Sequence, residues 1–268
     1  MTVDIKQKLK NEVWRSDIYY QLAKKGSSDI NHPGMQTLLN LAKSSKMVLD
    51  LGCGEGTRLN KIISNSNVAT GIDISKVAIN LAKRTYPEIK FLVADLENIP
   101  LSSDTFNLVY SAYVLEHLSN PHKMLLEAIR LTKKEGQIVL IAPNYGAPNR
   151  CSPPFKGSRS KKLIKGFIND FSLLFTRDKD INWEKVMPIS SKLKYDIDWD
   201  TTTEPYISSL ILFLKSKGLK VKYFTTCWKE ELKGAKLHQK VFRLLGKIGI
   251  YPFTRWGPHL VVVAKKIT

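Results

Sequence analysis

The chain has 268 residues, a hydrophobic content of 43% and a formal net charge of +18. This length suits one large domain with insertions, and no run approaches the ~18 consecutive apolar residues that a membrane-spanning helix needs. The first residues also lack the apolar stretch of a secretory signal. The positive charge indicates an anionic partner, such as nucleic acid, an acidic membrane surface or a phosphorylated molecule, unless it only keeps the surface solvated.

The cysteines are Cys53, Cys151 and Cys227, and they show neither a CxxC pair nor a Cys/His ligand spacing. We therefore predict no disulfide framework and no metal site. We expect a cytoplasmic protein that can rest on a membrane surface as a peripheral protein.

Residues 1–45 are expected to form two helices. The first runs to about Lys25 and carries the aromatic residues Trp14, Tyr19 and Tyr20. The second begins at Pro33, which suits the first turn of a helix, and runs to about Ser44.

Short apolar runs and helical patterns then alternate. The runs predict strands at 47–51, 68–73, 89–94, 106–110 and 136–142. Helices are predicted from Thr57, over 76–85 with Ser75 as the N-cap, and from Asn120-Pro121. Such alternation predicts an α/β fold with a doubly wound, mostly parallel sheet that is covered on both faces.

The alternation breaks over residues 144–204. We predict a cap inserted after the fifth strand, because about sixty residues is far longer than an ordinary connection. A helix at 205–216 and strands at 219–226 and 260–265 follow. The helix predicted at 229–248 has one basic and one apolar stripe, which suits either an anionic membrane surface or packing on the protein with a wet basic face.

Three glycines, Gly52, Gly54 and Gly56, directly follow the strand expected at 47–51. Glycine permits turns that other residues resist and leaves no Cβ in the way of a ligand. A strand, a glycine turn and a helix from Thr57 form the arrangement that binds a nucleotide-like cofactor in an open α/β sheet. For this motif alone, a tight turn without a ligand remains the alternative.

Carboxylates end the next two strands. Asp73 can accept two hydrogen bonds from ribose hydroxyls, because an ionised carboxylate is an acceptor only. Asp95 follows the strand at 89–94. The alternatives are a helix-start carboxylate for Asp73 and a turn-capping role for Asp95. The glycine pattern is GxGxG rather than GxGxxG, which disfavours a nicotinamide cofactor.

Four motifs now stand in order: Asp50-Leu-Gly-Cys-Gly-Glu-Gly56, Gly71-Ile-Asp-Ile-Ser75, Val93-Ala-Asp-Leu96 and Phe106-Asn-Leu-Val-Tyr-Ser-Ala-Tyr-Val-Leu-Glu-His-Leu118. Together they resemble the class I S-adenosylmethionine-dependent methyltransferases, most of all the broad type 11-like group that methylates quinones, lipids and sugars. The resemblance implies a seven-stranded Rossmann-like sheet and S-adenosylmethionine as the cofactor. It divides the chain into N-terminal helices over the cofactor pocket (1–45), a cofactor-binding half (46–143), an acceptor cap (144–204) and a C-terminal part (205–268).

The resemblance also implies roles for individual residues. Asp50, Gly52 and Gly54 would hold the methionine portion, and Ser111 would border it. Asp73 would take the ribose hydroxyls. Ile74, Asp95 and Leu96 would contact the adenine.

His117 follows the fourth strand and is the best-placed candidate for a general base, if the acceptor is a hydroxyl that must lose its proton. A packing or capping role for this ring is the alternative, and Tyr113 and His122 are weaker candidates. We expect O-methylation of a small, lipid-linked or sugar acceptor. An RNA methyltransferase and a non-catalytic cofactor-binding or scaffold protein remain the alternatives.

Overall fold

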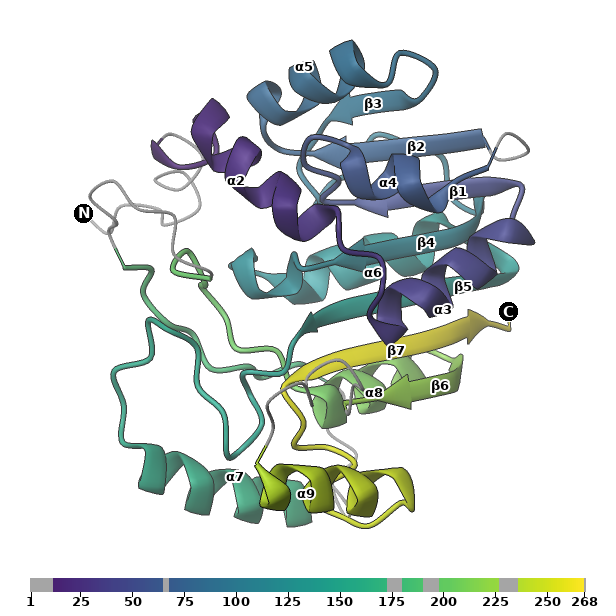
Figure 1. Cartoon of the computed structure of the whole chain (residues 1–268). Helices are drawn as coiled ribbons and strands as arrows, with labels where there is room; N and C mark the ends of the chain where they lie inside the picture. Colours follow the sequence, from purple (N-terminus) through teal and green to yellow (C-terminus); the bar gives the residue numbers. More distant parts are fainter. Residues whose placement is uncertain (1–11, 65–67, 173–179, 190–197, 227–235, 268) are drawn as a thin grey trace.

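The computed structural model describes residues 12–64, 68–172, 180–189, 198–226 and 236–267. Seven strands form one sheet in the order β3-β2-β1-β4-β5-β7-β6 (Figure 1). β7 runs antiparallel to β5 and β6, and the other neighbours are parallel. The predicted seven-stranded, mostly parallel sheet is confirmed. The strands are β1 Met47–Leu51, β2 Val68–Asp73, β3 Lys90–Val93, β4 Phe106–Ala112, β5 Thr132–Pro143, β6 Leu219–Thr225 and β7 His259–Lys266.

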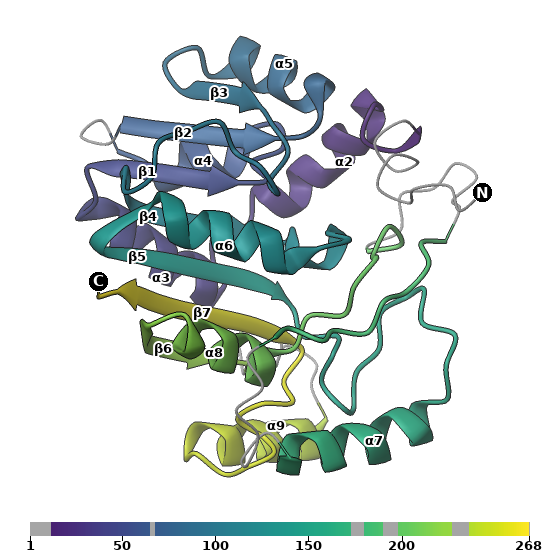
Figure 2. The ribbon, with the colours of Figure 1, turned by 180° about the vertical axis from the view of Figure 1, so that it is seen from behind.

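Helices cover both faces of this sheet, as Figure 2 shows from behind. One face carries α3 (Pro33–Lys43), α4 (Thr57–Ile62) and α5 (Lys76–Thr85), whose apolar residues share one buried cluster with the strands. The other carries α6 (Pro121–Leu131) and α8 (Ile207–Ser216) in a second cluster. None of the described helices is long and apolar enough to cross a bilayer.

Local sequence signals account for several helix ends. The Ser75 hydroxyl accepts a hydrogen bond from the Ala78 amide at 3.1 Å, which satisfies an otherwise unpaired donor in the first turn of α5. Gly218, with φ +81°, follows the end of α8 in a left-handed conformation that suits glycine. Both signals were readable from the sequence.

Other boundaries differ from the sequence prediction. β5 begins at Thr132, four residues before the predicted start at Gly136, because Thr132 pairs with Phe106 across a register shift in the ladder. β4 continues past Tyr110 to Ala112, since Ser111 and Ala112 pair with β5. An apolar run marks the centre of a strand, but the partner strand decides how far pairing extends.

Three further helices lie outside the two covering layers. α2 (Asp17–Ser27) lies near the carboxyl ends of β1 and β2. α7 (Arg159–Ser172) lies within the predicted cap, where the sequence analysis assigned no helix, and α9 (Leu237–Lys247) occupies part of the helix predicted at 229–248. Both lie beyond the β6 edge of the sheet in Figures 1 and 2.

Some predictions fall outside the described residues. These are the start of the first helix (1–11), two parts of the predicted cap (173–179 and 190–197), the first part of the 229–248 helix, and Cys227.

Asn144 connects three parts of the chain just after β5. Its side chain is fully buried. The amide nitrogen donates to the carbonyls of Arg255 and Gly257 at 2.7 and 2.9 Å, and the amide oxygen accepts from the Ile207 backbone N–H at 3.1 Å. One side chain therefore fixes the exit of β5, the approach to β7 and the start of α8.

We predict that Asn144→Leu destabilises the fold by about 2–4 kcal/mol, because it removes the Asn144 partner of three buried or partly buried backbone groups. Chemical unfolding measures this change in the free energy of unfolding. Asn98→Leu, at an exposed position, is the control and should stay within about 0.5 kcal/mol. Equal stability of the two variants would contradict the prediction.

Candidate active site

A cavity of about 810 Å³ opens at the carboxyl edge of the parallel strands. Its wall combines the turn after β1, the ends of β2 to β4, residues from Trp14 to Asp29 in and around α2, and Asp198 from the segment after β5. An open α/β sheet binds ligands at this edge, where the strand order reverses direction. Seven of the predicted site residues line the cavity: Gly52, Gly54, Asp73, Ile74, Asp95, Leu96 and His117.

The glycine turn brings bare backbone to this cavity. Gly54 has φ +54°, and an added Cβ there would meet no atom within 4 Å. Its space therefore belongs to the cavity rather than to the protein core. Gly52, with φ +84°, is constrained differently, because a Cβ there would lie 2.4 Å from a methyl of Val114. One glycine leaves room for a ligand, and the other allows close packing of the turn.

Asp73 is held rigidly at the end of β2. One carboxylate oxygen accepts from the Gly54 amide at 2.9 Å and the other from the Ser75 amide at 2.8 Å. Burial raises the pKa of Asp73, although these backbone donors lower it in part. The side chain thus serves the local turn and also faces the cavity.

Asp95 and its neighbours form the wall beside it. The Asp95 carboxylate accepts from the Glu97 amide at 3.0 Å, so the turn-capping contact is present while the residue also lines the cavity. Leu96 is buried in the core cluster of α6 and α8, and Ile74 is half-buried. These three provide one polar acceptor between two apolar surfaces.

Asp50 and Ser111 are fully buried, and neither lines the cavity. The Tyr110 hydroxyl donates to Asp50 Oδ2 at 2.7 Å, while Asp50 Oδ1 and Ser111 Oγ have no hydrogen-bond partner. Burial raises the pKa of Asp50 to about 7, and it outweighs the lowering effects of Tyr110 and Arg58.

Asp200 joins the two segments that close the cavity. Its Oδ2 accepts from the Trp14 indole at 3.3 Å and from the Tyr19 hydroxyl at 3.1 Å. Its Oδ1 lies 3.3 Å from Nδ1 of His117. The chain before the sheet and the chain after β5 therefore meet through one carboxylate.

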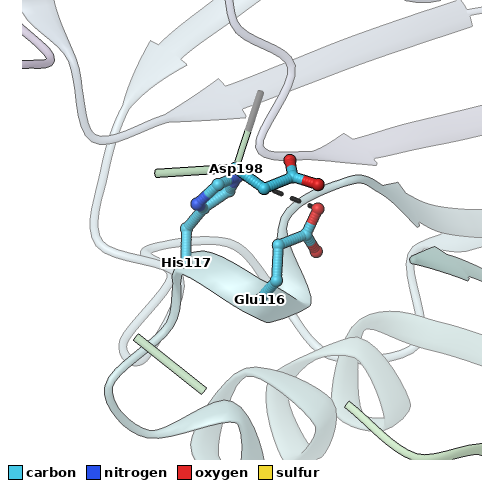
Figure 3. Close-up of side chains that lie close together, drawn as sticks. All are labelled: Glu116, His117 and Asp198. Atoms are coloured by element: carbon cyan, nitrogen blue, oxygen red, sulfur yellow. Dashed lines mark ion pairs between the residues drawn. The ribbon is translucent and has the colours of Figure 1, made fainter. Parts of the chain in front are cut away.

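Glu116, His117 and Asp198 form an acidic corner of the site (Figure 3). Glu116 and His117 belong to the short 3₁₀-helix η1 (Leu115–His117) after β4, and Asp198 approaches from the opposite segment. The His117 Nε2 atom lies 3.8 Å from Oε1 of Glu116. Glu116 is fully buried, and neither of its carboxylate oxygens has a hydrogen-bond partner.

This environment determines the protonation of His117. Burial lowers its pKa, but the charges of Asp200, Glu116 and Asp198 outweigh burial and raise the pKa to about 9. The ring therefore carries two protons at neutral pH, and in that form it donates hydrogen bonds but accepts none. Its predicted role as a general base, which needs the neutral ring, stays a prediction.

Sequence reasoning missed Asp198 and Asp200 as site residues. No local residue pattern indicated that residues 198–203 contact η1. The Thr202 and Thr203 amides donate to the Glu116 carbonyl at 2.8 and 3.1 Å, and this contact spans more than eighty residues of chain.

Comparison with known proteins gives a family and a fold that are consistent with the observed strand order. A family model described as a methyltransferase domain matches residues 42–190, more than half of the chain. A S-adenosylmethionine-dependent methyltransferase from Archaeoglobus fulgidus aligns over 92% of this chain and 94% of that one, with a TM-score of 0.52 at 18% identity.

The chain belongs to the class I S-adenosylmethionine-dependent methyltransferases. Its cofactor is S-adenosylmethionine. The malonyl-[acyl-carrier protein] O-methyltransferase of Buchnera aphidicola is 28% identical over 141 residues, 52% of this chain and 55% of that enzyme. The demethylmenaquinone methyltransferase of Chlamydia pneumoniae is 29% identical over 158 residues, 58% of this chain and 67% of that enzyme. The chain spans only part of the curated relatives that it matches, between 36% and 67% of their length.

The described residues of this methyltransferase fit that cofactor. The space beside Gly54 and the acceptor oxygens of Asp73 suit an adenosyl group, and the unpaired Asp50 Oδ1 suits an ammonium group or a bridging water. The cavity wall carries five acids, and its positively charged side chains are Lys25, Arg58 and the protonated His117. The acids are Asp29, Glu55, Asp73, Asp95 and Asp198. This excess of acids favours a cationic ligand.

We predict that the stability difference between the wild type and Asp50→Asn depends on pH. Asp50 is protonated in both states at low pH, but between its unfolded pKa and the folded value of about 7 only the unfolded chain ionises. The wild type should therefore lose about 2–3 kcal/mol relative to Asp50→Asn from pH 5 to 8, with little change above that. Urea unfolding across this range measures the loss, and a constant difference would contradict the buried, raised pKa.

Proposed function

We propose that this methyltransferase transfers a methyl group from S-adenosylmethionine to an oxygen atom of a small, lipid-linked or sugar-type acceptor. The observation that carries the proposal is that one cavity is lined by two kinds of surface. The glycine turn, Asp73 and Asp95 suit the cofactor, while His117 and Asp198 provide a separate polar corner. A cofactor and a second reactant could therefore lie side by side.

In this proposal Asp73 accepts from the ribose hydroxyls and Asp95 from the adenine amino group, with Ile74 and Leu96 against the ring. Asp50 balances the ammonium group from beneath the turn, and Ser111 stands behind the methionine end. The bound cofactor supplies a methyl group on a sulfonium, which is a strong leaving group. The chain has to orient the acceptor in line with that methyl and exclude water.

The contacts of Asp200 hold together the two chain segments that border the cavity. Trp14 and Tyr19 bind Asp200 from the α2 side, and the adjacent Asp198 reaches into the cavity. This arrangement supports the role of residues 144–204 as a cap that defines the acceptor site. The acidic corner then faces the acceptor rather than bulk solvent.

Exposed apolar residues on α7 and α9 support a lipid-linked acceptor. Five apolar residues of α7 recur at helical spacing and are exposed: Leu163, Ile164, Phe167, Ile168 and Phe171. α9 has no buried residue and exposes Leu237, Val241, Phe242 and Leu244, followed by Ile248. Contiguous apolar patches of this kind mark interaction sites.

The α7/α9 surface, defined as the exposed residues of these two helices, also carries cations. Lys161, Lys165, Lys240 and Lys247 are exposed among the apolar residues. Asp170 on α7 accepts from Tyr251 and Trp256, both at 2.9 Å, which fixes α7 to the segment after α9. A basic, apolar surface of this kind fits the anionic face of a lipid bilayer.

The acceptor class is tested with the purified full-length protein, methyl-labelled S-adenosylmethionine and a cell extract that is fractionated afterwards. We expect label in the lipid or small-molecule fraction. Asp73→Asn should weaken cofactor binding by about 10- to 100-fold, because one charge-assisted acceptor is lost. The exposed Asp104→Asn is the control. Label in RNA would favour the RNA methyltransferase alternative, and absence of cofactor binding would contradict the proposal.

Binding to vesicles tests the α7/α9 surface. The protein should sediment with phosphatidylglycerol vesicles and not with phosphatidylcholine vesicles. Lys165→Glu with Lys240→Glu should weaken this binding at least ~30-fold, at roughly 1 kcal/mol or more for each lysine reversed. Lys83→Glu with Lys90→Glu, near the opposite edge of the sheet, is the matched control. Equal loss in both pairs would indicate a net-charge effect and contradict a localised surface.

A further inference from the structure

The acidic corner and the adjacent Asp200 bring three carboxyl groups together, and burial raises the pKa of Glu116 to about 8. Glu116, Asp198 and Asp200 all lie near a single imidazole, that of His117. The Tyr145 hydroxyl donates to Asp198, and Trp14 and Tyr19 donate to Asp200. Glu116 receives no such donor, although it is fully buried. A buried carboxylate without partners is costly unless a cation or a proton offsets its charge.

The atoms of this corner already have the arrangement of a ligand set. One oxygen of Glu116, one oxygen of Asp198 and one ring nitrogen of His117 lie within 4.8 Å of one another. Bonds of about 2.0–2.2 Å to a shared ion would place the ligand atoms roughly 3.0–3.5 Å apart, so these atoms would have to approach by up to about 1.5 Å. His117 and Asp198 both border the open cavity, which leaves space for their side chains to rotate toward Glu116.

Asp200 lies beside the other nitrogen of the imidazole. Its Oδ1 lies 3.3 Å from His117 Nδ1, whereas Nε2 faces Glu116. Metal-binding histidines commonly present one nitrogen to the ion and the other to a carboxylate, which fixes the tautomer and the ring orientation. The backbone is fixed as well, because Thr202 and Thr203 donate to the Glu116 carbonyl.

We propose that Glu116, His117 and Asp198 bind a divalent metal ion at the acceptor end of the cavity. A set of one nitrogen and two oxygens suits Mn²⁺ or Zn²⁺ better than Ca²⁺, which takes oxygen ligands. Three protein ligands leave coordination positions open toward the cavity. This proposal departs from the sequence prediction that the chain has no metal site.

A metal ion here would also give the acceptor oxygen a means of activation. This step rests on the proposed function. A hydroxyl that coordinates the ion has a lowered pKa and loses its proton to solvent more easily, so its oxygen becomes a better nucleophile. His117 would then serve as a ligand, and no side chain would need to act as the base.

The test titrates Mn²⁺ into the full-length, chelator-treated protein and follows the free ion by electron paramagnetic resonance. We expect one saturable site. Glu116→Gln and Asp198→Asn should each weaken binding at least tenfold, with competition by Zn²⁺ in the wild type. Asp180→Asn is the matched control, because its exposed carboxylate lies 3.8 Å from His122 and the two belong to no three-ligand group among the described residues.

Binding at no defined site, or equal binding by Glu116→Gln and the wild type, would overturn the metal site. Two variants from different segments guard against a folding defect in one of them, and circular dichroism checks both. Cofactor binding by Glu116→Gln separates the two proposals. Methyl transfer that persists in chelator without added metal would remove the metal role and leave the methyltransferase function standing. Metal binding without any methyl transfer would leave the metal site standing and contradict the methyltransferase function.

Discussion

The parallel register of β1 with β2 and β4 is the constraint on which the site depends. Asp50 stands opposite Gly71 on one side and Tyr110 on the other. Beyond the paired residues, the amides of Gly52 and Cys53 both donate to the Ile72 carbonyl, at 2.8 and 2.9 Å. The glycine turn therefore begins at a fixed height beside the end of β2. Asp73 and the turn face one space because hydrogen bonds in the sheet hold both.

The same register puts a carboxylate beneath the turn. Asp50 lies inside the sheet, with one oxygen bonded to Tyr110 and the other without a partner. A folded protein keeps such a group at a cost when a ligand is absent. We interpret the position as a preformed site for positive charge. A buried acid at this position is the group expected in a site that binds a cationic cofactor.

The charge of the molecule is divided between its surface and its cavity. The net charge is +18, yet the acids around the cavity outnumber the lysine and arginine side chains there. Exposed lysines lie on many elements, and on α7 and α9 they occur together with exposed apolar residues. In our proposal, the α7/α9 surface meets an anionic lipid surface, while the acids of the cavity favour a positively charged ligand. Overall charge alone therefore says little about the ligand in the cavity.

The sequence by itself determined the sheet, the glycine turn and the placement of Asp73 and Asp95, because these depend on short apolar runs and on residues adjacent to them. It did not determine α7, whose apolar face is exposed, or the exact extent of β4 and β5, which their pairing sets. The acidic corner also required the tertiary structure. Glu116 and Asp198 are separated by about eighty residues, and only the folding of the segment after β5 onto η1 brings them together. Contacts between distant segments depend on packing geometry, for which local residue patterns carry no signal.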